Sequence, residues 1–150
     1  METPLVTKND TYANIVREGI ERGYEVIPEF RVWVHKQEIS KSIDLVWATR
    51  QDRKSTRQDR PNLEYWILAA TFEIEACDVR INKEFRRHLV SLPNIHSFNQ
   101  LIPVVHCIPL YTAAFDRSEI KRISHAVDIC ERAKAAEPYG VHVFTVGSNQ

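Results

Sequence analysis

Residues 65–76 read YWILAATFEIEA, and this stretch decides the fold. Nearly every position is apolar until Glu73 and Glu75, and the segment contains neither glycine nor proline. A run that is apolar on both faces is typical of a strand at the centre of a sheet that is covered on both sides. We therefore predict a central strand over 65–76, and we expect the rest of the chain to supply its neighbours and its covering helices.

The segments before this strand predict one helix and two further strands. Over residues 11–22 apolar side chains recur at helical spacing, with Asp10 placed to cap the start and Gly23 to end the helix. Residues 24–34 and 42–48 alternate apolar and more polar side chains, as strands do. Because only a short polar turn separates these two strands, we expect them to form a hairpin.

The segments after the central strand predict helices and strands in alternation. The expected elements are a helix, a strand, a second helix and a last strand, over 80–92, 101–110, 116–136 and 141–146. The inward stripe of the first of these helices includes His88. The inward stripe of the second is expected to contain Ile120, Ile123, Val127 and Cys130. The full order predicts an α/β fold: a central mixed β-sheet flanked by helices, with an α-β-β-β-α-β core and an extra C-terminal helix and strand.

The composition is that of an ordinary globular domain. The chain has 150 residues, of which 43% are hydrophobic, and its 20 basic residues balance 20 acidic ones. This length suits one domain that spans residues 1–150. The balanced charge indicates neither a globally acidic nor a globally basic partner, so local charge must identify any ligand.

The cysteines and the N-terminal sequence indicate a cytoplasmic protein. Cys77, Cys107 and Cys130 are odd in number and widely spaced, without a C-x-x-C pair, which predicts reduced thiols in the core. Residues 1–12 lack the basic-then-apolar pattern of a signal peptide. No apolar run approaches the ~20 residues of a membrane span.

Three carboxylates lie inside the predicted strands rather than in loops. Asp44 interrupts the apolar segment SIDLVW, and Glu73 and Glu75 are two positions apart, which places both on one face of their strand. Burying a carboxylate is costly unless it is paired or bound to a cation. Because Mg²⁺ is held by one or two carboxylates together with waters and substrate phosphate, these residues predict a divalent-cation site.

The order of elements and the positions of these acids resemble the PD-(D/E)xK nuclease superfamily, the fold of many restriction enzymes and Holliday-junction resolvases. The resemblance covers roughly residues 10–110, and it rests on the α-β-β-β-α-β core with an Asp on the second strand and a (D/E)-x-K pair on the third. Asp44 matches the metal-binding Asp of the family, and Glu73 matches its metal-binding acid. Glu75 stands where the lysine is expected.

The resemblance implies a nuclease that hydrolyses DNA with Mg²⁺ as cofactor, for which Mn²⁺ would substitute. Asp44 and Glu73 would hold the metal, with Glu29 as a further metal-binding carboxylate from the hairpin. Glu75 would complete the metal shell or accept a proton from the attacking water. Lys83, on the following helix, would stabilise charge on the phosphate. Cutting both strands of a duplex with a subunit of this size also implies a homodimer.

Basic side chains follow both acid-bearing strands. The polar loop 49–64 joins these two strands and contains a net excess of positive charge, and the helix over 80–92 adds a second basic stripe. Positive charge near the acids would attract the phosphates of a nucleic acid. The residues expected to contact them are Arg50, Arg53, Lys54, Arg57, Arg60, Arg80 and Arg87.

Two alternatives to a nuclease stay open at the level of sequence. Glu75 in place of lysine is compatible with a catalytically silent nuclease-fold module that binds nucleic acid or a protein partner. A non-nucleic ligand-binding domain would instead pair the three acids with arginines. Zinc hydrolases and nucleotide-binding P-loops are not indicated, because the histidine spacings and the glycine-rich phosphate motif of those classes are missing.

Overall fold

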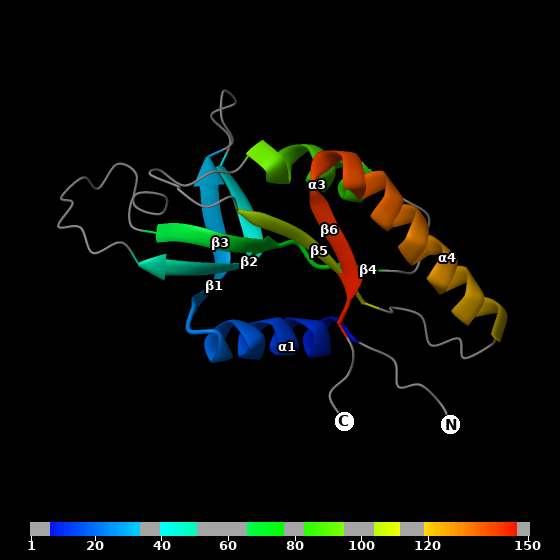
Figure 1. Ribbon diagram of the computed structural model, residues 1–150, viewed down its shortest axis with the longest axis horizontal. Coiled ribbons are helices and arrows are strands. Elements are labelled where there is room, and N and C mark those ends of the chain that lie inside the picture. Colours follow the sequence, from blue (N-terminus) through cyan, green and yellow to red (C-terminus); the bar gives the residue numbers. More distant parts are fainter. Residues whose placement is uncertain are drawn as a thin grey trace.

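The computed structural model describes residues 7–33, 40–50, 66–76, 83–94, 104–111 and 119–146. In this part of the chain a mixed six-stranded sheet is flanked by three helices (Figure 1). The helices are α1 (Lys8–Glu21), α3 (Lys83–Ser91) and α4 (Glu119–Ala136), with 3-10 turns η1 (Leu92–Asn94) and η2 (Glu137–Tyr139). The strands are β1 (Glu25–Trp33), β2 (Ser40–Arg50), β3 (Trp66–Phe72), β4 (Glu75–Ala76), β5 (Val105–Tyr111) and β6 (Val141–Thr145). This architecture confirms the predicted α/β class and the mixed sheet flanked by helices.

The sheet begins as an antiparallel meander and ends as a parallel array. Strands β1, β2 and β3 pair antiparallel in chain order, which includes the predicted hairpin. Strand β5 pairs in parallel with β3, and β6 pairs in parallel with β5. The parallel connections pass through α3 and α4, because a chain that returns in the same direction needs a crossover.

Strands β3 and β4 are two parts of one strand that is interrupted opposite Pro109. Glu75 lies opposite Leu110, with the same parallel offset that pairs β3 with β5. That offset sets Ile74 opposite Pro109, which has no backbone N–H to donate to the ladder. The prediction of one unbroken strand over 65–76 is therefore wrong at its acidic end.

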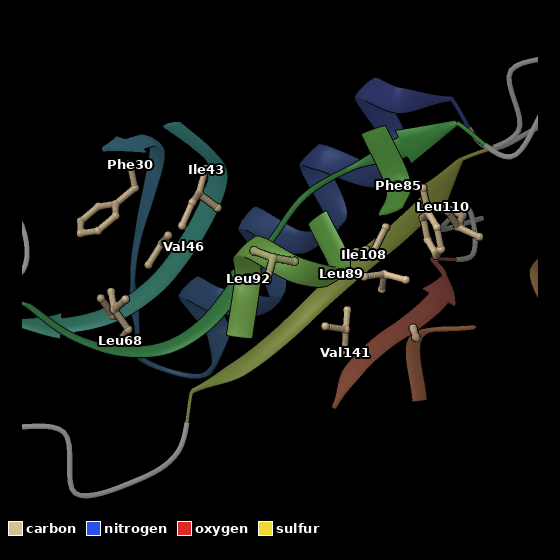
Figure 2. Packing of buried hydrophobic residues seen from close by; sticks show 12 residues of the cluster. Phe30, Ile43, Val46, Leu68, Phe85, Leu89, Leu92, Ile108, Leu110 and Val141 are labelled. Carbon is tan, nitrogen blue, oxygen red and sulfur yellow. The ribbon is translucent and has the colours of Figure 1, made fainter. Parts of the chain in front are cut away.

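The two faces of the sheet have separate apolar cores. The core under α1 contains Ile15, Leu45, Ala70, Phe72, Ile74 and Cys107. The core under α3 and α4 joins helix residues to strand residues, among them Phe85, Leu89, Leu92, Leu68, Ile108 and Leu110 (Figure 2). Each fully buried Leu, Ile or Phe contributes about 1.5–3 kcal/mol. Since β3 contributes to both cores, its predicted place at the centre of a covered sheet is confirmed.

Helix α1 begins earlier than predicted and ends where predicted. Thr7 is its N-cap: the Thr7 hydroxyl accepts a hydrogen bond from Asp10 N–H at 3.1 Å, and the Asp10 carboxylate accepts one from Thr7 N–H at 3.3 Å. This reciprocal capping box makes Asp10 the third helical residue, so the prediction that Asp10 is the cap was wrong. At the other end Gly23 adopts φ 86°, a left-handed conformation that ends helices.

The residues of helix α4 that face the sheet differ from the predicted ones. Arg132 and Ala136 are fully buried, whereas Val127 is 51% exposed and Cys130 is exposed. The guanidinium of Arg132 lies 5.0 Å from the ring centroid of Phe85, so an arginine fills an inward position that the pattern had treated as polar. The predicted inward position of Val127 and Cys130 is therefore wrong. The side chains of Ile120 and Ile123 lie outside the described residues.

Helix α1 packs on the sheet through a close contact between Gly19 and Trp47. The Trp47 indole N–H donates to the carbonyl of Ile15 at 3.1 Å, and Trp47 stacks on Tyr24 with ring centroids 5.7 Å apart. A side chain at position 19 would occupy the space that Trp47 and Val26 fill. Gly19 is thus required by close approach, while Trp47 has the packing role expected of a core aromatic residue.

Replacing Gly19 with alanine is expected to destabilise the protein, although the same change in an open helix interior stabilises by about 1 kcal/mol. The new Cβ would lie 2.7 Å from Trp47 Cδ1 and 2.7 Å from Val26 Cγ2, so α1 or Trp47 must move. We expect the free energy of unfolding, measured by urea titration, to fall by about 1–3 kcal/mol. Ile20→Ala, at a site that is 62% exposed on the same helix, is the control. A stability of Gly19→Ala at or above wild type would contradict this packing.

Candidate functional site

Strands β2 and β3 separate at Asp44 and Glu73. Their antiparallel ladder extends to the pair Leu45–Phe72, and Asp44 and Glu73 are the next residues on each side. From there β2 stays paired with β1, whereas the continuation of β3 into β4 stays paired with β5. The two strands therefore form a fork in the sheet, and two of the predicted acids lie where it opens.

Each acid at the fork accepts a hydrogen bond from the backbone of the opposite strand. Asp44 N–H donates to Glu73 Oε1 at 3.2 Å, and Ile74 N–H donates to Asp44 Oδ2 at 2.9 Å. Backbone donors left unpaired in such a place would cost about 1–3 kcal/mol each. The two side-chain bonds replace ladder bonds that the separating strands can no longer make, so one oxygen of each carboxylate has a structural role.

Glu73 and Glu75 share a partner on α3, His88. The Nε2 atom of His88 lies 2.8 Å from Glu75 Oε1 and 3.5 Å from Glu73 Oε2. Glu73 is 5% exposed and His88 is 8% exposed, so the cluster lies beneath α3 rather than on the surface. An imidazole N–H between two carboxylates offsets part of their mutual repulsion. The structure thus brings Asp44, Glu73 and Glu75 together, with a histidine that was not predicted as a site residue.

The position of His88 in the sequence already indicated that this side chain needs a polar partner. It occupies the inward stripe of α3, between the buried residues Phe85 and Leu89. A polar side chain on the buried face of a helix needs a buried hydrogen-bond partner. The acids on the strand immediately before α3 are candidate partners, but which of them His88 contacts depends on the tertiary structure.

Glu29 lies on the strand next to Asp44 in an unusual backbone conformation. It falls between the pairs Pro28–Leu45 and Phe30–Ile43, which sets it opposite Asp44 in the register of β1 and β2. Its φ is 49°, in the left-handed region that non-glycine residues rarely adopt. The Glu29 side chain is exposed and accepts a hydrogen bond from the Ser42 hydroxyl at 2.9 Å. Glu29 therefore lies beside the fork at its solvent-exposed edge.

The predicted basic residues are less concentrated at the fork than the acids. Lys83 begins α3, five positions before His88 and thus about 140° around the helix axis, and its side chain lies outside the described residues. Arg87 is exposed on α3. Arg50 ends β2, six residues beyond Asp44 and up to about 20 Å along the strand. The remaining predicted phosphate contacts lie outside the described residues: Arg53, Lys54, Arg57, Arg60 and Arg80.

The donor atoms at the fork fit a hard divalent cation that takes few protein ligands. Mg²⁺ prefers oxygen and is commonly held by one or two carboxylates, with waters and substrate completing its shell. Asp44 and Glu73 supply two carboxylates on neighbouring strands. Among the described residues, no group of three or more His, Cys, Asp or Glu side chains is arranged to hold a metal ion. Asp44 and Glu73 are thus oxygen donors of the kind that a hard cation takes, and within the described part of the chain they do not belong to a closed structural metal cage.

A groove on the other side of the sheet is separate from this cluster. It has a volume of about 610 Å³ and is lined by residues of α1, β2, β3 and the C-terminal strand, among them Arg17, Glu18, Glu21, Trp47, Phe72 and Phe144. Trp47 and Phe72 belong to the core under α1, whereas His88 comes from α3 on the opposite face. The groove and the fork therefore cannot form one site.

Cys107, on β5, is a buried thiol, and its environment makes it unreactive. It lies 5% exposed in the core under α1, and burial raises its pKa from 9.0 to about 12. A thiol with so high a pKa supplies no thiolate nucleophile at neutral pH. The prediction of core thiols is confirmed for Cys107 and wrong for the exposed Cys130, while Cys77 lies outside the described residues.

Comparisons with known proteins identify no similar protein. The chain matches no family model, no curated protein and no solved structure. Within the described residues, the helices are too short or too polar to cross a membrane.

Substituting Asp44 separates the structural and the charged role of its carboxylate. Asp44→Ala removes the acceptor of Ile74 N–H, and we expect it to lower the free energy of unfolding by about 1–3 kcal/mol. Asp44→Asn keeps an amide oxygen for that bond and should lie much closer to wild type in urea titrations. Equal losses in the two variants would show that the hydrogen bond from Ile74 does not support the fork.

The two described thiols should differ sharply in reactivity. At pH 8 iodoacetamide is expected to modify Cys130 in the folded protein and to leave Cys107 intact, as read by peptide mass spectrometry. Because folding raises the Cys107 pKa to about 12, its stabilising contribution is complete below pH 9.0 and is lost as pH rises from there. Unfolding in urea should expose both thiols to reagent. Rapid modification of Cys107 in the native protein would contradict its burial.

Proposed function

We propose that this protein is a metal-dependent nuclease that hydrolyses phosphodiester bonds in DNA at the fork between β2 and β3. The observation that supports it best is the pair of hydrogen bonds at the fork, in which Asp44 N–H donates to Glu73 Oε1 and Ile74 N–H donates to Asp44 Oδ2, so that two carboxylates are held on neighbouring strands. Glu75 extends the acidic cluster along the same strand face. The α/β order of elements and these acids together support the resemblance to PD-(D/E)xK nucleases.

In this proposal Asp44 and Glu73 hold the cation through the oxygens that do not bond to the backbone. Bound Mg²⁺, or Mn²⁺ in its place, would act as a Lewis acid on the phosphate and lower the pKa of a bound water. Glu75 would complete the metal shell or accept the proton of that water. Glu29, at the exposed edge beside Asp44, is the further metal-binding candidate, and Lys83 is the candidate that stabilises charge on the phosphate.

The DNA would approach from the side of the predicted basic residues. Arg87, exposed on α3 one position before His88, is the nearest of them in sequence to a residue of the cluster. Arg50, the loop that follows it and Arg80 would supply the remaining phosphate contacts. A homodimer would give one site for each strand of a duplex. We also propose that the protein acts in the cytoplasm.

A catalytically silent module is the second candidate, because the acids already have internal partners. Asp44 Oδ2 and Glu73 Oε1 bond to backbone amides, and Glu75 Oε1 bonds to His88. A cluster that is satisfied in this way needs no metal for its stability. In this alternative the fork is a structural device, and the exposed arginines bind nucleic acid or a protein partner without cleavage.

Asp44→Asn is the variant that distinguishes these functions. It keeps the acceptor for Ile74 N–H but removes the charge that a cation requires. We expect wild-type protein to cleave supercoiled plasmid or branched DNA with Mg²⁺ or Mn²⁺. The variant should lose more than the roughly 10–100-fold that changes around metal ligands produce. Initial rates on agarose gels, with chelator added to parallel reactions, provide the measurement.

Asp10→Asn is the matched control, since it makes the same chemical change in the capping box of α1, away from the fork. It should cleave like wild type. Cleavage by Asp44→Asn at the wild-type rate would remove Asp44 from the site. An inactive wild-type protein that also binds no Mn²⁺ in calorimetry would instead favour the silent module.

A further inference from the structure

We propose that His88 is a positioning residue that holds Glu73 and Glu75 in the arrangement that binds the cation. This inference rests on the proposed metal-dependent function and adds to it a residue from outside the strands. His88 Nε2 faces both carboxylates, at 2.8 Å from Glu75 Oε1 and 3.5 Å from Glu73 Oε2. The shorter distance is a charge-assisted hydrogen bond, in which the imidazole N–H donates and the carboxylate accepts.

The imidazole is held in place by the packing of α3, and Glu75 lies beside it on a short strand. His88 lies on the buried face of α3 together with Phe85 and Leu89, which are 0–4% exposed. Glu75 belongs to β4, a strand of two residues whose described ladder partner is β5. The rigid helix therefore sets the position of a carboxylate at the end of a short strand.

The shared donor also restrains two like charges. Glu73 and Glu75 lie two positions apart on one strand face, so their carboxylates repel each other in a poorly hydrated site. Glu73 is held from one side by Asp44 N–H and faces His88 from the other. Without the imidazole N–H the Glu75 carboxylate would swing away, and the acidic cluster would open. Groups that orient metal-binding carboxylates in this way typically change metal affinity by 10–100-fold.

Calorimetric titration with Mn²⁺ tests this role apart from catalysis. His88→Leu should raise the dissociation constant for Mn²⁺ by about 10–100-fold. His88→Gln places an amide N–H near the position of Nε2 and should stay close to wild type. His106→Gln is the matched control, because His106 is also 8% exposed and its Nδ1 pairs with the Thr71 hydroxyl, so the Mn²⁺ affinity of this variant should be unchanged. Circular dichroism shows that each variant is folded at the temperature of the titration.

Each result supports or overturns the role of His88. Wild-type affinity in His88→Leu would overturn it and leave the proposed nuclease intact. If His88→Gln binds Mn²⁺ as weakly as His88→Leu does, His88 does not act by donating a hydrogen bond. Absence of Mn²⁺ binding by wild type would overturn the proposed function and this inference with it. If His88→Leu does not fold, His88→Asn takes its place, since its amide is too short to reach Glu75 and the same loss of affinity is expected.

Discussion

The two hydrogen bonds that the side chains of Asp44 and Glu73 accept from the backbone of the opposite strand are the constraint on which the centre of this fold depends. Two strands that separate in the middle of a covered sheet leave backbone groups without ladder partners, and water cannot reach them easily. Here Asp44 N–H donates to Glu73 Oε1, and Ile74 N–H donates to Asp44 Oδ2. The sheet can therefore divide into a hairpin edge and a parallel half without buried unpaired donors at this position, and the helices can pack on both halves.

The same interactions connect the fold to the proposed chemistry. A carboxylate has two oxygens, and a backbone amide at the fork uses one of them on each acid. The hydrogen bond restricts the rotation of the carboxylate and so limits the directions in which its second oxygen can point. Pre-positioned oxygens of this kind suit a cation that is completed by water and substrate. The structural role of the acids and the proposed metal site are therefore compatible rather than competing explanations.

The sequence predicted the parts of this arrangement that depend on patterns along the chain. The covered central strand, the α/β order and the gathering of Asp44, Glu73 and Glu75 followed from apolar runs and from the two-residue period of strands. Contacts between elements that are distant in the chain could not be predicted from the sequence in this way. The break in the strand depends on Pro109 from β5, and the partner of Glu75 is His88 from α3, while an arginine rather than an apolar side chain faces inward on α4. These features follow from tertiary pairing, which periodicity does not encode.

Irregularities in strand pairing occur side by side on neighbouring strands, so that they form one line across the sheet. Glu29 on β1 adopts a left-handed backbone opposite Asp44, β2 and β3 separate at Asp44 and Glu73, and Pro109 on β5 interrupts the ladder beside Ile74. A residue such as Glu29 in this conformation costs of order 1 kcal/mol, and it persists only where its surroundings enforce it. Three interruptions at one level weaken the sheet along a single line. Because Asp44 and Glu73 lie on that line, the energetic cost is concentrated where the chain also brings its strand carboxylates together.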